Sequence, residues 1–171
     1  MTTRKSLICV AAILMSATAA LADISVWLDP ATPTVDVGGT VFVDLMASFD
    51  EPVMAWGLDL TIGYPTYASW IDTKIGDDWD ATTTLDGDGL AGLRFPSGVS
   101  GDVLLATLTF EGLSAGTTSL AVSSGPEEDE GILLQAGSLA TNVQFTGACL
   151  TVVPEPAAFV LLAGLLVLRR R

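Results

Sequence analysis

Residues 104–111 read LLATLTFE, a short stretch in which apolar and polar side chains alternate. The apolar side chains are Leu104, Ala106, Leu108 and Phe110. The polar side chains between and after them are Thr107, Thr109 and Glu111. A period of two is typical of a β-strand with one buried face. We therefore predict a strand here that places the four apolar side chains in a core.

The same alternation recurs along the chain, with Pro, Gly and Asp-Gly clusters between the runs. The further runs are 24–28, 41–47, 56–62, 120–122, 132–134 and 143–145. No long segment keeps a helical period, although Tyr67 to Ile71 (YASWI) allows one short helical turn. Seven to nine short strands predict an all-β fold, an antiparallel two-sheet β-sandwich.

The last of these strands changes phase. Its apolar residues occupy odd positions through Phe145 and then shift to Ala148, Leu150 and Val152. Gly147 lies at the change, and glycine within a strand pattern often marks a β-bulge. We expect a bulge at Gly147 that resets the register.

Charge excludes several classes of function. The chain has 171 residues with 7 basic and 20 acidic side chains, and it has no histidine. Between residues 23 and 153 only Lys74 and Arg94 are basic, against 19 carboxylates, which gives a net charge of −17. Such a surface repels phosphate backbones, so we expect no nucleic-acid partner. Without histidine, Ser-His-Asp and Cys-His catalysis is absent, and we expect a non-enzymatic protein that needs no cofactor.

Residues 1–22 fit a secretory signal peptide. Arg4 and Lys5 precede an apolar core at 7–15, and small residues end in Ala20-Leu21-Ala22, which places cleavage before Asp23. The apolar core is too short for a membrane-spanning helix, which needs roughly 20 residues, so a permanent amino-terminal anchor is the weaker alternative. We expect export and a mature chain that begins at Asp23.

The carboxyl end, residues 154–171, has three parts. Pro154-Glu155-Pro156 is followed by twelve uncharged residues, AAFVLLAGLLVL, and then by Arg169, Arg170 and Arg171. The prolines end the preceding strand, the apolar run enters a bilayer, and the arginines hold its end on the cytoplasmic side. As a helix the run spans only about 18 Å against a hydrocarbon core of roughly 30 Å. It is therefore a transmembrane helix suited to temporary anchoring.

This tail resembles the PEP-CTERM sorting signal of bacterial surface proteins in the order and spacing of its three parts. The resemblance implies recognition by an exosortase, a membrane-embedded transpeptidase-like enzyme, and removal of the tail near the triplet. It also implies a place at the cell surface or in an exopolysaccharide or biofilm matrix. An ordinary tail anchor is the alternative.

The body, residues 23–153, resembles the bacterial cohesin domain, a scaffold module of cellulosomes, and related carbohydrate-binding modules. The matching stretches are VGGTVFV at 37–43, the run 56–62, GLAGLRF at 89–95, LLATLTF at 104–110 and GTTSL at 116–120. The resemblance implies a cohesin-like sandwich of jelly-roll type that binds another protein or a glycan and catalyses nothing.

Acidic loops offer a candidate calcium site. Carboxylates cluster around Asp86 and Asp88, and oxygen-rich loops suit Ca²⁺. An EF-hand frame fails, because aligning these two residues to its third and fifth positions puts Phe95 where a bidentate Glu belongs. The alternative is a hairpin turn at Asp86–Gly89 and a solvated acidic loop at 127–130.

Aromatic residues offer a candidate glycan site. Trp70 and Trp79, with Tyr64 and Tyr67, lie outside the clean alternating faces and close to aspartates. Rings beside carboxylates can stack on sugars and accept hydroxyl hydrogen bonds. The alternative is that one or two rings cap the core beneath a loop.

Cys149, the single cysteine after signal cleavage, is expected to be an inert thiol within a strand rather than to pair between chains.

Three functions therefore stay open. The first is an exported structural or adhesive protein, sorted through its tail and associated with an extracellular polysaccharide matrix or a surface protein. The second is a glycan-binding module centred on Trp70 and Trp79. The third is a Ca²⁺-dependent protein-docking module.

Overall fold

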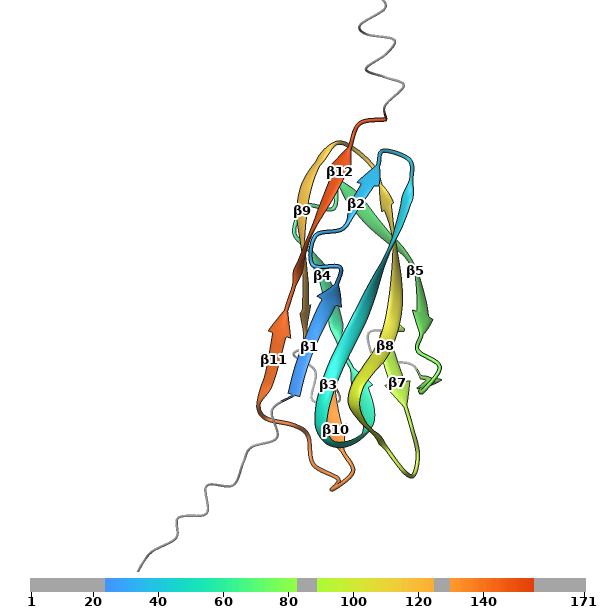
Figure 1. Cartoon of the computed structure of the whole chain (residues 1–171), viewed down its shortest axis with the longest axis vertical. Coiled ribbons are helices and arrows are strands. Elements are labelled where there is room, and N and C mark those ends of the chain that lie inside the picture. The colour runs from blue at the N-terminus through green and yellow to red at the C-terminus, as the bar shows by residue number, and fades with distance from the viewer. Residues whose placement is uncertain (1–23, 83–88, 125–129, 156–171) are drawn as a thin grey trace, which may run out of the picture.

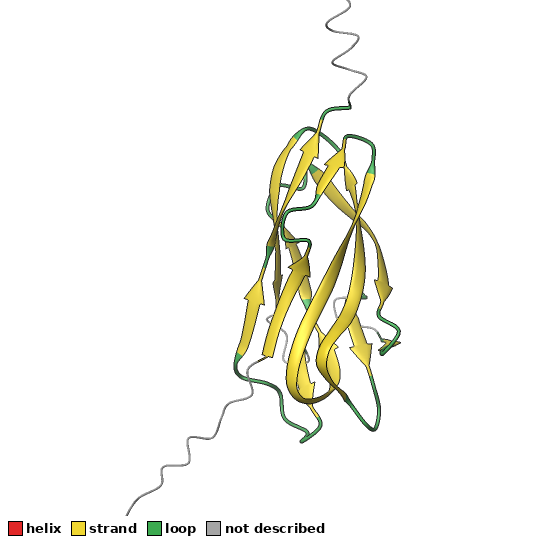
Figure 2. Ribbon diagram, viewed as in Figure 1, coloured by secondary structure: helices red, strands yellow, loops and turns green. Residues whose placement is uncertain are grey.

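A computed structural model describes residues 24–82, 89–124 and 130–155. These residues form two packed sheets, as Figures 1 and 2 show, and every regular element among them is a strand. The two-sheet, all-β prediction is confirmed. The expected signal peptide, its cleavage site at Ala20, Ala22 and Asp23, and the tail helix lie outside the described residues.

The larger sheet holds eight strands. They are β1 (Ile24–Asp29), β3 (Thr40–Gly57), β5 (Ala68–Ile75), β6 (Asp80–Ala81), β7 (Ala91–Leu93), β8 (Val99–Gly112), β10 (Gly131–Leu134) and β11 (Val143–Thr146). β3 and β8 form its centre, β5 pairs with the free side of β8, and β1 and β11 continue the sheet beyond β3.

The smaller sheet holds four strands in the order β2-β12-β9-β4. They are β2 (Thr34–Asp36), β4 (Asp59–Ile62), β9 (Gly116–Ser123) and β12 (Ala148–Val153). Two pairings are parallel, β1 with β11 and β2 with β12, because the first and last segments of the body run side by side in the same direction. The predicted antiparallel pairing is therefore present in the other strand pairs of the described residues and absent at these two.

The core lies between the inner faces of the two sheets. In β1 and β9 every second side chain is buried, as the alternation predicted. β8 departs from its predicted pattern, because its register against β3 shifts by one residue between Leu104 and Ala106. Leu105 is the extra residue and is fully buried, so Leu104 points outward instead of into the core.

Two predicted strands divide between the sheets. The run 56–62 breaks at Leu58: Trp56 belongs to β3 in the larger sheet, whereas residues 59–62 form β4 in the smaller sheet. The break predicted at Gly147 is also present, but it is a change of sheet from β11 to β12 rather than a bulge within one ladder. A third such change separates β1 from β2.

The short helical turn allowed at 67–71 is wrong, because residues 68–75 form the strand β5. β5 carries its own register shift, with Ile71 as the extra residue between Trp70 and Asp72. The shift bends the edge of the larger sheet and discourages pairing with another chain.

Candidate functional site

The two tryptophans predicted to share a glycan site lie in different surroundings. Trp79 is only 5% exposed and packs edge to face against Trp56 and Phe49, with ring centroids 6.2 Å apart in each pair. The ring thus caps the core, the alternative considered for it above. Trp70 remains as the one partly exposed tryptophan of the pair.

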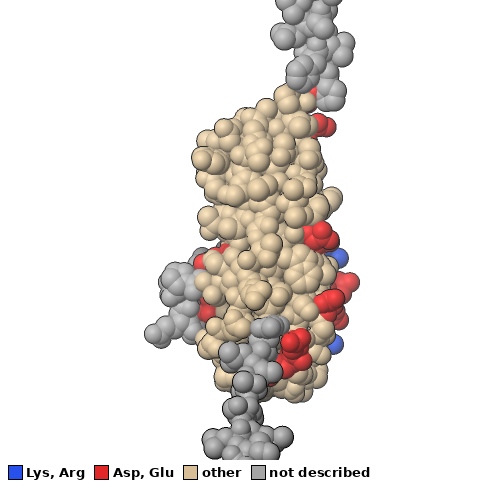
Figure 3. Space-filling model, turned by 60° about the vertical axis from the view of Figure 1, so that its left-hand side comes forward, with Lys and Arg blue, Asp and Glu red and all other residues tan. Residues whose placement is uncertain are grey.

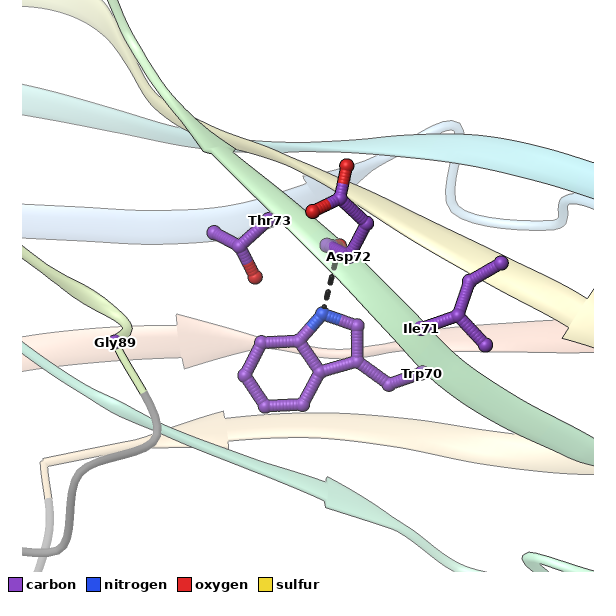
Figure 4. Close-up of a pocket in the computed structure, with 5 residues that line it drawn as sticks. All are labelled: Trp70, Ile71, Asp72, Thr73 and Gly89. Atoms are coloured by element: carbon purple, nitrogen blue, oxygen red, sulfur yellow. Dashed lines mark hydrogen bonds between the residues drawn. The ribbon is translucent and has the colours of Figure 1, made fainter.

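Trp70 lines an open groove of about 420 Å³ beside the edge strand β5, together with Ile71, Asp72, Thr73 and Gly89. Figure 4 shows its indole extending from β5 toward Gly89. The indole Nε1 donates a hydrogen bond to the backbone oxygen of Asp72 at 3.0 Å, which fixes the ring. The residues paired with β5 in β8 place Trp70 and Thr73 on the inner side of β5 and Asp72 on the outer side. Thr73, which carries a hydroxyl group, therefore lies on the same side of β5 as the indole of Trp70.

The acidic clusters are only partly described. Asp86 and Asp88 lie outside the described residues, although β6 and β7 on either side of them pair antiparallel. Among residues 24–82, 89–124 and 130–155, no group of three or more acidic or sulfur side chains could hold a metal ion. Glu130 is only 6% exposed, so the expectation of a solvated acidic loop is wrong for this residue.

The sorting triplet begins directly at the end of the sandwich. Pro154 and Glu155 follow the last residue of β12 and are exposed, whereas Pro156 and Arg169 to Arg171 lie outside the described residues. No helix in the part of the chain that the structure describes is long and apolar enough to cross a membrane.

A further surface was missed by the sequence analysis. We call the outward-pointing side of β1, β3, β8 and β5 the front face. Trp27, Met46 and Leu104 form one row across β1, β3 and β8, and all three are partly exposed. Phe42, on the same side of β3, is 63% exposed. Aromatic and apolar side chains that gather on the solvent side of a sheet are typical of an interaction surface.

Carboxylates surround these apolar residues. Those on the front face, by their register, are Asp29, Asp44, Asp72, Asp102 and Glu111. Thr107 donates a hydrogen bond to Asp44 Oδ1 at 2.7 Å, and Lys74 is the paired neighbour of Thr107 on β5. In Figure 3, which shows the front face at its right-hand edge, the red side chains gather along that edge.

The opposite surface of the sandwich has a different character. The outward side of the smaller sheet carries mostly small uncharged side chains, including Thr34, Thr117, Ser119, Cys149 and Thr151. Asp36 and Asp59 lie at its corners. Cys149 lies within the strand β12, as predicted, and its side chain is exposed on this surface. This surface offers no large apolar anchor, which leaves the front face as the better candidate for docking.

No family model and no curated protein matches the chain. Solved structures with a similar fold include cohesins. A non-cellulosomal cohesin from the archaeon Archaeoglobus fulgidus has a TM-score of 0.56 at 15% identity, covering 80% of this chain and 96% of that one. A cohesin module from a Clostridium perfringens family 33 glycoside hydrolase has a TM-score of 0.56 at 10% identity, covering 79% and 98%.

A third similar structure is CaCohA2 of Clostridium acetobutylicum, solved in a complex with a second protein. Its TM-score is 0.52 at 16% identity, and the match covers 76% of this chain and 99% of that one. The body is therefore a cohesin-like sandwich, and at these identities the likeness establishes the fold alone.

Proposed function

We propose that the chain is an exported, non-catalytic adhesive or protein-docking module of the cell surface or its matrix. The observation that carries the proposal is the front face of a cohesin-like sandwich, where Phe42 is exposed and the row Trp27, Met46 and Leu104 is partly exposed. One of the similar cohesins is described in a complex with a second protein. By analogy, the partner we propose is another surface protein.

The charges of the front face indicate the chemistry of that partner. Apolar residues surrounded by carboxylates fit a partner whose own apolar patch is surrounded by lysine or arginine. Charge attraction of this kind speeds association and weakens as salt is added. We therefore expect binding that falls between low and high ionic strength.

The test is retention of surface proteins from the native host on the immobilised chain, compared with a Phe42→Ser variant. Phe95→Ser is the matched control, because Phe95 is 69% exposed at an end of the sandwich. We expect the wild type and the control to retain a partner that Phe42→Ser does not retain. We also expect added salt to release this partner. Equal retention by both variants would exclude the front face.

The finer part of the proposal concerns sorting. The PEP-CTERM-like tail would hold the body at the membrane until an exosortase-type enzyme removes the tail, and the body would then enter an extracellular polysaccharide matrix. Support comes from the sequence of residues 154–171 and from the exposure of Pro154 and Glu155 just beyond β12.

A second candidate function is glycan binding in the groove beside Trp70. The fixed and partly exposed indole and the neighbouring hydroxyl of Thr73 favour it, since a ring face can stack on a sugar. Affinity electrophoresis in polysaccharide gels tests it with Trp70→Ala against Phe95→Ala. Retardation of the wild type and of Phe95→Ala that is lost in Trp70→Ala would support glycan binding in the groove. Identical mobilities of all three proteins in every gel would exclude it.

The calcium-dependent alternative predicts a melting temperature that falls when EGTA is added.

A further inference from the structure

Three turns meet where the chain leaves the sandwich. The amide of Val37 donates to the oxygen of Val153 at 2.9 Å, Gly38 donates to Gly112 at 2.7 Å, and Leu113 donates to Tyr67 at 2.8 Å. Gly38 has a φ of +77°, which permits the tight turn between β2 and β3. We call this end, formed by the turns at 36–39, 63–67 and 112–115, the exit pole. Figure 1 shows it at the top, where β12 ends.

The exit pole exposes apolar and aromatic side chains. Leu113 is 44% exposed and Tyr64 is 62% exposed, whereas Val37 and Val153 are half-buried between them. The charged side chains of this end are Asp36 and Glu155. Tyrosine is enriched at the level of lipid headgroups in membrane proteins, because its ring is apolar at one end and polar at the other.

The connection from the exit pole to the apolar tail is very short. Only Pro154, Glu155 and Pro156 separate Val153 from the uncharged run that begins at Ala157. The four Cα–Cα steps from Val153 to Ala157 reach at most about 14 Å, even when fully extended. The headgroup layer beyond the hydrocarbon is itself about 6 Å thick on each side. A body whose tail begins in the hydrocarbon therefore keeps its exit pole within about 8 Å of the headgroups.

The length of the apolar run strengthens this contact. Twelve helical residues span about 18 Å, so the run falls short of a hydrocarbon core of roughly 30 Å. Such a mismatch is accommodated by thinning of the bilayer and by snorkelling of flanking side chains, here the arginines at 169–171. A run this short leaves no surplus apolar length that could lift the exit pole away from the headgroups.

From this geometry we propose that, before its tail is removed, the sandwich rests on the phospholipid headgroups through its exit pole, with Leu113 and Tyr64 at the contact. The inference rests on the proposed role of the tail as a membrane anchor. The body then stands with its long axis away from the membrane, so the front face on its flank stays open to partners.

The test uses the chain from Asp23 to Arg171 in phosphatidylcholine vesicles, with a nitrobenzoxadiazole dye on one introduced thiol. Cys149→Ser removes the native thiol, and the dye is attached to Leu113→Cys or to the control Phe95→Cys at the opposite end of the sandwich. Flotation with the vesicles reports on the anchor, and dye emission reports on the exit pole.

We expect both labelled proteins to float, with blue-shifted and brighter emission for Leu113→Cys only. Flotation with the same aqueous emission at both positions would overturn the inference and leave the anchor intact. Failure of the labelled proteins to float would overturn both the membrane-anchoring role of the tail and the contact of the exit pole with the headgroups. Twelve Gly-Ser residues inserted between Val153 and Pro154 should remove the blue shift, and an unchanged shift would contradict the role of the short connection.

Discussion

Trp79 contacts Trp56 edge to face in the core, with an angle of 87° between the ring planes, and it contacts Phe49 in the same manner. Neither indole nitrogen, of Trp56 or Trp79, has a hydrogen-bond partner within the described residues. Their contribution to stability therefore comes from packing and ring geometry rather than from hydrogen bonding.

Replacement of Trp79 should cost far more stability than replacement of Trp70. We expect Trp79→Ala to lower the free energy of unfolding by about 3–5 kcal/mol, because the substitution leaves a large cavity between Phe49 and Trp56. Trp70→Ala, at the edge of the larger sheet, should cost about 1 kcal/mol. Urea unfolding followed by circular dichroism measures both, and equal losses would contradict the different surroundings of the two rings.

Gly92 is the site of a second prediction. A methyl group added there would lie 2.6 Å from Nε1 of Trp56 and 3.0 Å from Cβ of Trp79. Gly92→Ala should therefore destabilise the protein by about 1–3 kcal/mol through overpacking. In a double-mutant cycle, Trp56→Phe should reduce the cost of Gly92→Ala. Simple additivity of the two substitutions would argue against contact between these residues.

The change of sheet at Gly147 gives a third prediction. A methyl group at Gly147 would collide with the backbone oxygen of Leu120, which cannot move without disturbing the ladder between β12 and β9. Gly147→Ala should cost about 3 kcal/mol. Gly63→Ala is the matched control, because its methyl group would meet the hydroxyl of Ser119, which can rotate away. The melting temperature of Gly63→Ala should stay much closer to that of the wild type.

Accessibility of the thiol is a fourth prediction. Cys149 is exposed on the outward side of the smaller sheet. The mature native protein should therefore react with Ellman's reagent without denaturant and release one equivalent of thionitrobenzoate. Reaction that requires guanidinium would mean that the thiol is covered.

The sequence predicted the strands well because burial of one face leaves a direct trace in the order of apolar residues. The alternation of Ile24, Val26 and Leu28 and that of Leu120 and Val122 match the buried positions. The pattern cannot tell which sheet a strand joins, so the change at Leu58 was missed. It also cannot locate an extra residue when the bulged positions are all apolar, as at Leu104, Leu105 and Ala106.

The candidate sites were harder to predict because they depend on distant segments. Trp70 and Trp79 are close in sequence, yet one lies on an edge strand and the other in the core, and no local pattern distinguishes them. The row Trp27, Met46 and Leu104 joins three strands, and it exists only in the register that the folded sheet adopts. The tail at 154–171 was accessible to sequence reasoning, since its charge and apolar order are properties of one continuous segment.

The most direct test of an exported and sorted surface module is the intact mass of the protein recovered from its native host, together with the cell fraction that contains it. The account predicts a mature chain that begins at Asp23 and ends near Pro154, recovered from the envelope or extracellular matrix. A mass that includes Met1 would contradict export through a cleaved signal, and one that retains Arg171 would contradict removal of the tail.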